Sequence, residues 1–266
     1  MYKINRIDDF EFISFPILDE YSNLVYGFTT RKGGVSKGNY ATMNIGFGTG
    51  DSEENVSNNY RIMAEKLNIK IEDIVETDQK HTNNIRYVTE KYKGRAMMDP
   101  EYTEIDGLYT DRKNLALMTF HADCSGVFFY DPVQKIIGLA HAGWRGTVTN
   151  IVGAMVRGFV KLRSNPTHIK AAIGPSLGQC CFEVDEDVKE LFLQTNIKFK
   201  EFMVTRGEKY HFDLWEINKY NMLKEGMKEE NISISGLCTK CNNDLFFSHR
   251  GQKGVRGLMA GLIMMK

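Results

Sequence analysis

The chain has 266 residues, of which 42% are hydrophobic, so it is long enough to bury a substantial core. Its 34 Lys and Arg residues are balanced by 34 Asp and Glu residues. This balance excludes the strong positive field with which proteins bind nucleic acid or a membrane surface, and it favours a small or locally recognised ligand.

The first nine residues, Met1 to Asp9, lack the apolar run of a signal peptide, and no later apolar stretch approaches the length of a membrane span. We therefore expect a cytoplasmic protein whose five cysteines are thiols or metal ligands. No Pro-rich linker, low-complexity segment or repeat interrupts the sequence, which predicts a single domain over residues 1–266. A monomer and a homodimer are both compatible with this composition.

Apolar runs of strand length alternate irregularly with segments of helical periodicity. In chain order, they first predict a strand at 24–28 and then a helix that begins at Asp51 or Ser52 and buries Val56, Tyr60, Met63 and Leu67. Strands are predicted next at 85–88, 115–120, 127–130 and 136–140, followed by a helix at 147–159. The last predicted elements are a strand at 169–173, a helix at 214–227 and a strand at 258–264. Several strands alternate poorly between apolar and polar residues, which indicates that they are buried on both faces.

The turn Asp131-Pro132-Val133-Gln134 places proline at its second position and joins the strands at 127–130 and 136–140 as an antiparallel hairpin. Mixed sheets flanked by helices, an α/β (α+β) architecture, follow from the irregular order of strands and helices. A doubly wound nucleotide-binding sheet is disfavoured for the same reason. Because the sequence has no G-x-G-x-x-G or G-x-x-x-x-G-K-[ST] phosphate loop, ATP and NAD are not expected as cofactors.

Two motifs adjoin this hairpin. His121-Ala122-Asp123-Cys124 precedes its first strand, and His141-Ala142-Gly143-Trp144-Arg145-Gly146-Thr147 follows its second strand. Antiparallel pairing therefore brings Cys124 and His141 together. Thiolate and imidazole are ligands that zinc prefers, and one further nitrogen would leave the open position of a catalytic zinc site. Spacing alone does not choose that third ligand from His81, His121, His168, His211 and His249.

The structural alternative is that each residue serves the fold alone. An isolated cysteine is commonly a small buried hydrophobe, and an isolated histidine commonly makes one hydrogen bond at a strand end. The pair of Cys124 and His141, however, lies in Gly-rich turns that also carry Asp and Arg. This combination favours a functional site.

Ordered motifs along nearly the whole chain resemble the YfiH/YlmD family, the laccase-domain proteins. They occupy residues 30–36 (TRKGGVS), 43–46 (MNIG), 79–81 (QKH), 105–110 (IDGLYT), 121–124 (HADC), 141–147 (HAGWRGT), 173–184 (IGPSLGQCCFEV) and 246–250 (FFSHR). The resemblance departs at Thr82, where the family usually has Gly, and at Gly251, where a second Arg often stands. Neither departure removes a metal ligand: the first concerns the shape of the loop that carries His81, and the second puts one possible anion contact in doubt.

This resemblance implies a layered α/β sandwich with mixed sheets and a metal site formed by His81, Cys124 and His141. It implies Zn2+ as the metal, with Cu2+ as the alternative. It also implies a purine nucleoside phosphorylase that acts on adenosine, inosine and S-methyl-5′-thioadenosine with phosphate, together with an adenosine deaminase activity.

Roles for the neighbouring residues are hypotheses built on this implied chemistry. Asp123 could orient or deprotonate a water molecule during deamination. Arg145 with the amides of Gly146 and Thr147 at a helix start, together with Arg31 and Arg250, could form a phosphate cradle. A local cap or salt bridge is the structural alternative for Arg145. Asn44, in the motif at 43–46, completes the candidate catalytic residues.

The remaining cysteines are interpreted as structural. Cys180 and Cys181 are adjacent and cannot form an ordinary unstrained bridge, so we expect them to pack below the site. Cys238 and Cys241 form a lone C-x-x-C, for which a turn is a better interpretation than a second zinc or a redox site.

Four other functions compete with the phosphorylase. A copper-dependent polyphenol oxidase (laccase) needs about ten histidines, commonly as H-x-H, whereas this chain has six and no such pair. A thiol hydrolase could use Cys124 as nucleophile and His141 as base. A nucleobase deaminase of the H-x-E and P-C-x-x-C type is disfavoured because Ala122 and Asp123 follow His121. A non-catalytic nucleoside-binding protein is the last alternative.

Overall fold

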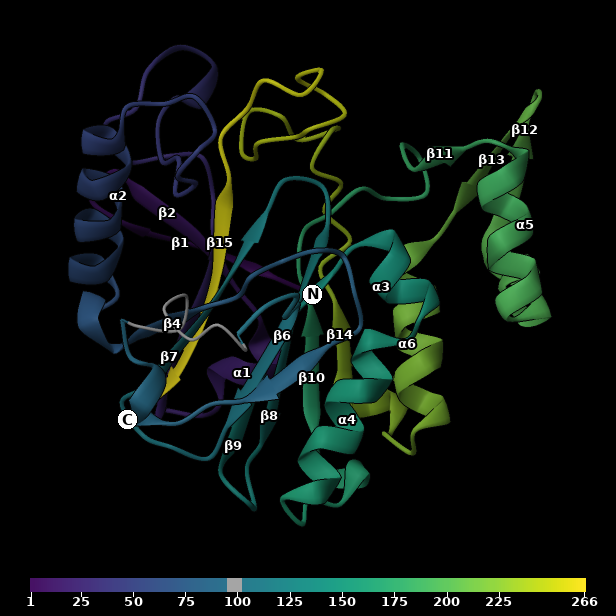
Figure 1. Ribbon diagram of the computed structural model, residues 1–266, viewed down its shortest axis with the longest axis horizontal. Coiled ribbons are helices and arrows are strands. Elements are labelled where there is room, and N and C mark those ends of the chain that lie inside the picture. The colour runs from purple at the N-terminus through teal and green to yellow at the C-terminus, as the bar shows by residue number, and fades with distance from the viewer. Residues whose placement is uncertain (95–101) are drawn as a thin grey trace.

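The computed structural model describes residues 1–94 and 102–266, and most of its strands belong to two six-stranded sheets (Figure 1). The first sheet has the order β1 (Lys3–Ile7), β2 (Phe10–Ser14), β3 (Leu24–Thr29), β15 (Met259–Met265), β7 (Ala116–His121) and β4 (Ile74–Glu76). The second has the order β14 (Ile232–Ile234), β10 (Lys170–Ile173), β8 (Ser125–Asp131), β9 (Ile136–Ala142), β6 (Gly107–Thr110) and β5 (Ile85–Tyr87). Both sheets are mixed, because β4 with β7, β5 with β6 and β10 with β14 are parallel pairs among antiparallel ones.

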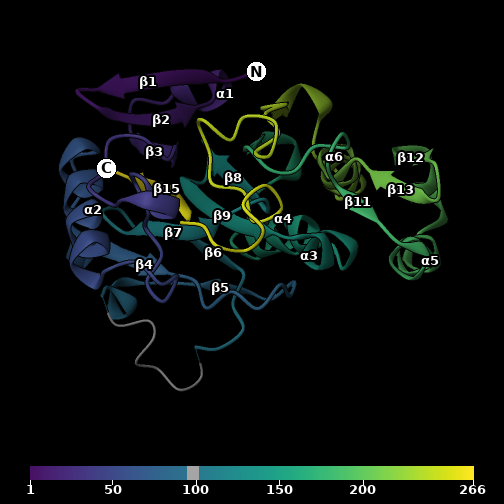
Figure 2. The same ribbon diagram turned by 90° about the horizontal axis from the view of Figure 1, so that it is seen from above.

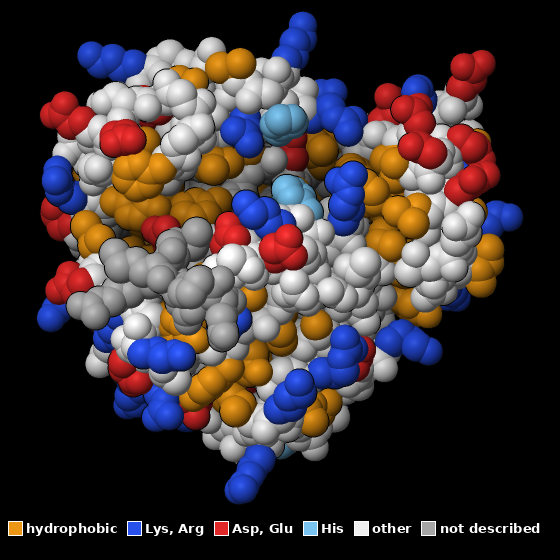
Figure 3. All heavy atoms as spheres, in the orientation of Figure 1, with side chains coloured by type: hydrophobic (Ala, Val, Ile, Leu, Met, Phe, Trp, Pro, Cys, Tyr) orange, Lys and Arg blue, Asp and Glu red, His pale blue; other side chains and the backbone are white. Residues whose placement is uncertain are grey.

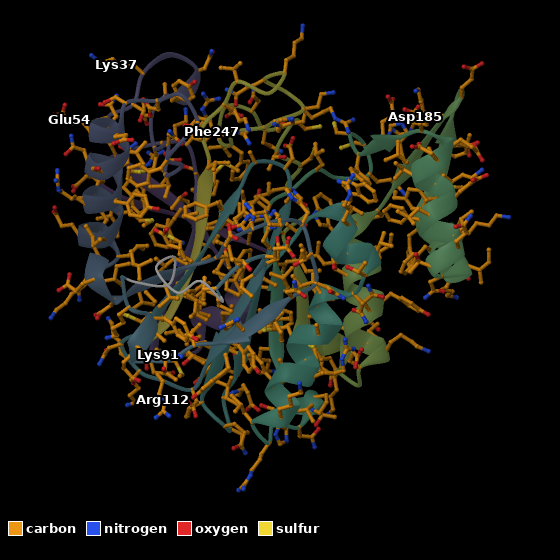
Figure 4. All side chains as sticks on the ribbon, in the orientation of Figure 1. Lys37, Glu54, Lys91, Arg112, Asp185 and Phe247 are labelled. Atoms are coloured by element: carbon orange, nitrogen blue, oxygen red, sulfur yellow. The ribbon has the colours of Figure 1, made fainter. Side chains whose placement is uncertain are left out.

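Six α-helices, several short 3-10 helices and a small third sheet are the other regular elements of the described part of the chain. The helices are α1 (Pro16–Asp19), α2 (Glu53–Lys66), α3 (Trp144–Val148), α4 (Ile151–Lys161), α5 (Glu186–Thr195) and α6 (Leu214–Lys224). The small sheet has the order β11 (Glu183–Val184), β13 (Lys209–Phe212) and β12 (Met203–Arg206). It forms a lobe with α5 at one side of the molecule, where Figure 4 labels Asp185 just before α5 (Figures 2 and 4). None of the helices described is long and apolar enough to cross a membrane.

The two large sheets pack face to face, with α2 outside the first and α4 and α6 outside the second (Figures 1 and 2). Phe128 packs into the core between the sheets, whereas its neighbours Val127 and Phe129 pack against the α4 side. Leu262 and Ile263 of β15 divide in the same way between the α2 side and the core between the sheets. Strands buried on both faces read as continuous apolar runs. The predicted α/β sandwich with mixed sheets is therefore confirmed.

Most predicted elements are present, and the hairpin is as predicted: Asp131 pairs with Ile136, and its Oδ1 accepts hydrogen bonds from the turn amides of Val133 and Gln134. The helix at 53–66 begins after Ser52, although the Ser52 side chain makes no capping bond. The helix predicted at 214–227 ends at Lys224.

The prediction of one continuous helix at 147–159 is wrong, because the chain breaks between α3 and α4. Asn150 has φ 64° and its side chain accepts a hydrogen bond from the Gly153 amide. A left-handed residue cannot continue an α-helix, and Asn is among the residues that tolerate this conformation and cap a new helix.

Asn150→Ala is expected to lower the free energy of unfolding by about 1 to 2 kcal/mol, because it removes the cap and leaves a Cβ in the left-handed region. Asn150→Gly loses the cap but relieves the backbone, so its loss should be only a few tenths of a kcal/mol. Urea unfolding of both variants measures the difference. Equal losses would contradict this account of the break.

Candidate metal and ligand site

Side chains from three strand ends and one loop converge at one end of the second sheet. Gly126 pairs with His141 in the β8–β9 register, so Cys124, two residues before Gly126, lies beside the end of β9. His81 approaches from the loop that precedes β5. One ligand atom each from His81, Cys124 and His141 lie within 4.8 Å of one another. The predicted approach of Cys124 to His141 is thus present, and these residues could hold a metal ion.

His81 is the only histidine besides His141 in this group, although the sequence left five open for the third position. The others lie outside it: His121, His168, His211 and His249. His121 is fully buried and its ring nitrogens contact the Thr119 hydroxyl at 2.7 Å and the Cys124 carbonyl at 3.1 Å. Burial lowers its pKa well below the usual value, so His121 is a neutral structural residue.

Asp106, immediately before β6, holds both histidines in place. Its Oδ1 accepts a hydrogen bond from His141 Nδ1 at 2.8 Å and from the His81 amide at 3.0 Å. Its Oδ2 accepts bonds from the amides of Lys80 and Thr82 and from the Thr82 hydroxyl. With His141 Nδ1 engaged, Nε2 is the nitrogen left for a metal. The Thr82 hydroxyl thus adds one further bond between the His81 loop and this carboxylate.

Sequence reasoning missed this role of Asp106. The available signal was its place in the IDGLYT motif, between an apolar residue and glycine. Nothing in that motif says which histidine the carboxylate will meet, because β6 reaches His141 only through sheet pairing with β9.

Charge in the cluster favours a thiolate. Burial alone would raise the pKa of the Cys124 thiol, but His141 and His81 lower it to about 6. Burial would likewise lower the pKa of His141, but Cys124 and Asp106 raise it to about 9. Burial would raise the pKa of Asp106, whereas His141 and the Thr82 amide lower it to about 2. The directions of these shifts favour a Cys124 thiolate beside a protonated His141.

Gly143 leaves the space in which these ligands meet. A Cβ on Gly143 would lie 2.8 Å from His81 Cδ2 and 3.2 Å from Cys124 Sγ. Gly143→Ala should therefore displace His81 and weaken metal binding about 10-fold or more, as loss of ligand orientation does in other sites. Competition with a chelating dye measures this affinity.

Gly138→Ala is the matched control for that substitution. Its Cβ would meet Phe159 Cε1 at 2.8 Å and Met155 Sδ at 2.9 Å in the core, away from the cluster. It should cost stability and leave metal affinity unchanged. Equal affinity losses in both variants would show that Gly143 acts only through folding.

A cavity of about 340 Å³ opens beside the cluster, a volume within the range of small-molecule sites. Its lining includes His81, Ala122, Asp123, Cys124, Trp144, Leu177, Phe182, Leu214, His249, Arg250 and Arg256. Figure 3 shows histidine and basic side chains gathered around a hollow on this face. The cavity combines an apolar, aromatic wall with thiol, imidazole and guanidinium groups. Such a surface suits a flat heteroaromatic ligand that carries an anionic group or binds together with a separate anion.

Asp123 and Arg250, both candidate residues from the sequence, line this cavity. Asp123 has φ 87°, and its Oδ1 and Oδ2 accept hydrogen bonds from the Thr239 hydroxyl at 2.6 Å and from the Arg250 amide at 2.7 Å. The Arg250 guanidinium donates to the Glu183 carbonyl at 3.3 Å. Asp123 therefore also connects the segment at 239–250 to the turn that carries Cys124.

Arg31, Asn44 and Arg145, the other candidate residues, are not among the residues that line the cavity. Arg31 donates to the carbonyls of Ala41 and Asn243, and its guanidinium lies 4.7 Å from the ring centre of Phe247, which Figure 4 labels. Asn44 is fully buried and bonds the loop backbone at Gly46. Arg145 is exposed and lies over the Trp144 ring. These contacts are structural, and the catalytic roles of the three residues stay predictions.

Arg256 lines the cavity but was missed by sequence reasoning. Its Nε is buried and has no hydrogen-bond partner among the described residues. Burial lowers the pKa of Arg256, while Asp123 and Cys124 act in the opposite direction. A buried guanidinium nitrogen that lacks a partner is costly unless an acceptor, such as an anion, satisfies it. The signal in the sequence was weak, because Arg256 follows the FFSHR motif by six residues in a segment without periodicity.

Comparison with known proteins gives consistent matches. A family model described as "Multi-copper polyphenol oxidoreductase laccase" matches residues 25–266. Purine nucleoside phosphorylase YlmD of Bacillus subtilis (strain 168) is 37% identical over 250 residues, which cover 91% of this chain and 89% of the relative. Adenosine deaminase RL5 of an unknown prokaryotic organism is 29% identical over 231 residues, or 85% of this chain and 88% of the relative. The crystal structure of Bacillus licheniformis hypothetical protein YfiH superposes with TM-score 0.90 at 34% identity and covers 99% of both chains.

Proposed function

This chain belongs to the multi-copper polyphenol oxidoreductase laccase family, the YfiH/YlmD proteins, and from this membership and its site we propose that it is a zinc-dependent purine nucleoside phosphorylase with an adenosine deaminase activity. The observation that carries the proposal is the His81, Cys124 and His141 cluster beside a cavity with an aromatic wall and two arginines. Relatives named purine nucleoside phosphorylase and adenosine deaminase support both activities.

The ligand set fits zinc. Two imidazoles and one thiolate are borderline-soft donors, and three protein ligands are the usual number at a catalytic zinc site. Asp106 orients His141 through Nδ1, as carboxylates commonly orient zinc-binding histidines. When bound, zinc supplies Lewis-acid polarisation and makes water more acidic.

Purine binding is assigned to the apolar wall of the cavity. Trp144 and Phe182 offer aromatic surface, and Leu177 and Leu214 extend it. A purine base can stack on such rings without hydrogen-bond readout, which agrees with acceptance of adenosine, inosine and S-methyl-5′-thioadenosine.

Phosphate binding is assigned first to Arg256, with Arg250 as its neighbour in the lining. Phosphorolysis needs a phosphate dianion held against the sugar, and the unpartnered Arg256 Nε is a donor that such an anion would satisfy. In deamination, Asp123 orients a water molecule and accepts its proton. Asp123 can do so because carboxylate oxygens retain acceptor capacity beyond one hydrogen bond each.

A metal analysis combined with chromatography of adenosine, with and without phosphate, tests the proposal. Cys124→Ala and His81→Ala should each lose about one zinc ion per chain together with phosphate-dependent release of adenine. His168→Ala removes an exposed imidazole outside the cluster and serves as the matched control. It should keep both zinc and activity.

Three other results would overturn the proposal. Adenosine turnover by metal-free protein, lost in Cys124→Ala, would establish a Cys124 thiol hydrolase. Zinc without any nucleoside turnover would leave a nucleoside-binding protein. Copper uptake with oxidation of phenols would establish a polyphenol oxidase, although the described residues place only His81 and His141 among the histidines of a metal cluster.

A further inference from the structure

The fold brings the four remaining cysteines together, outside the site described above. Cys180 and Cys181 lie between β10 and β11, and Cys238 and Cys241 follow β14. Their four Sγ atoms all lie within 4.8 Å of one another. The two segments are joined where the Ser176 amide donates to the Leu237 carbonyl and the Thr239 amide donates to the Ser176 carbonyl. The sequence interpretation, which treated the two pairs as separate, is therefore corrected.

The spacing of these sulfurs suits a shared metal ion. Cys241 Sγ is 3.6 Å from Cys180 Sγ and 3.5 Å from Cys181 Sγ. Zn–S bonds of about 2.3 Å in a tetrahedron place sulfurs about 3.8 Å apart. A disulfide needs about 2.05 Å, so these sulfurs are not bonded.

The chemistry of the cluster selects the kind of metal. Four soft thiolates without imidazole or carboxylate are typical of structural zinc or an iron–sulfur centre. Cys238 is buried while Cys180 and Cys241 are exposed, so an ion can enter from solvent.

We propose that Cys180, Cys181, Cys238 and Cys241 bind a second, structural zinc ion. This ion would join two segments that shape the cavity. One carries Leu177 and Phe182 of the cavity wall, and the other carries Thr239, whose hydroxyl donates a hydrogen bond to Asp123. A closed four-sulfur site has no open position for substrate, so it serves the shape of the cavity. The proposal does not depend on which reaction the first site performs.

Cys124→Ala protein is the direct test, because it retains only the four clustered cysteines. It should purify with about one zinc ion per chain, against about two in the wild type. After exchange with cobalt, it should show the intense charge-transfer absorption and tetrahedral d–d bands of all-sulfur coordination. Cys238→Ser with Cys241→Ser in the same background should lose both signals, and far-ultraviolet circular dichroism reports whether that variant is folded.

A second measurement keeps the test decisive if the double serine variant does not fold. Titration of folded Cys124→Ala protein with a mercurial should release its zinc to an indicator dye as the four thiols react. Absence of zinc with four free thiols, or a thiol count of two after denaturation, would overturn the proposal, the latter in favour of a disulfide. Iron with visible absorption would overturn zinc in favour of an iron–sulfur centre.

Discussion

Asp106→Asn is expected to weaken metal binding by the His81, Cys124 and His141 cluster about 10- to 100-fold, although Asp106 itself is not a ligand. The carboxylate accepts bonds from His141 Nδ1 and from the amides of the His81 loop. An Asn side chain must turn its NH2 group toward one of these donors. Either His141 or the loop then loses its orientation.

The same substitution should lower the free energy of unfolding by about 3 to 5 kcal/mol, the usual loss when one partner of a buried charged pair is removed. Metal affinity by chelator competition and stability by urea unfolding are the two measurements. Asp131→Asn is the matched control: Asp131 is also fully buried and accepts backbone bonds, but in the β8–β9 turn. It should lose stability and retain metal affinity. An unchanged affinity in Asp106→Asn would refute the orienting role.

The pH dependence of stability in metal-free protein gives a further check on Asp106. Its pKa in the folded protein is about 2, below the usual 3.8. A depressed pKa contributes stability that is present above the usual value and is lost as the pH falls toward 2. The contribution is about 2 to 3 kcal/mol. Asp106→Asn should therefore show a shallower loss of stability between about pH 4 and pH 2 than the wild type.

Arg256→Met is expected to raise the KM for phosphate about 10- to 100-fold, and to leave deamination of adenosine nearly unchanged. The substitution removes one charge-assisted hydrogen bond to phosphate, of about 1.5 to 3 kcal/mol, and 1.4 kcal/mol corresponds to a factor of ten. It also removes the buried, unpartnered Nε, so the folded protein should lose no stability through this change. Rates of both reactions at varied phosphate concentration measure the effect.

Arg112→Met is the matched control, because Arg112 pairs with Asp111 and is not among the residues that line the cavity. It should change neither reaction. Parallel measurements on Arg31, Arg145 and Arg250 variants rank the guanidinium groups that the sequence singled out. An equal loss of both reactions in Arg256→Met would mean that Arg256 shapes the cavity and does not bind phosphate.

The predicted elements that the structure confirms share one property: the apolar and polar residues within each element follow a pattern that can be recognised from the local sequence alone. The strand at 127–130 is recognisable because Val127, Phe128, Phe129 and Tyr130 are apolar on both faces. The split between α3 and α4 was missed because its cause is a single residue, Asn150, whose left-handed backbone leaves no mark on the apolar periodicity.

The candidate site divides in the same way. Cys124 and His141 flank one hairpin, so a turn of known type and a two-residue period bring them together. His81 was chosen only through resemblance to a family. No local pattern links it to the hairpin, since the loop that carries it reaches the cluster through Asp106.

The sequence by itself determined what is buried, which strands form the hairpin, and which thiol and imidazole meet at its open end. The tertiary structure alone decided that Asp106 orients the histidines, that Arg256 lines the cavity with an unpartnered Nε, and that two distant cysteine pairs form one cluster. The physical reason is the range of the interactions: hydrophobic periodicity and turn geometry act over a few residues, whereas these contacts join segments that approach only after the sheets have assembled.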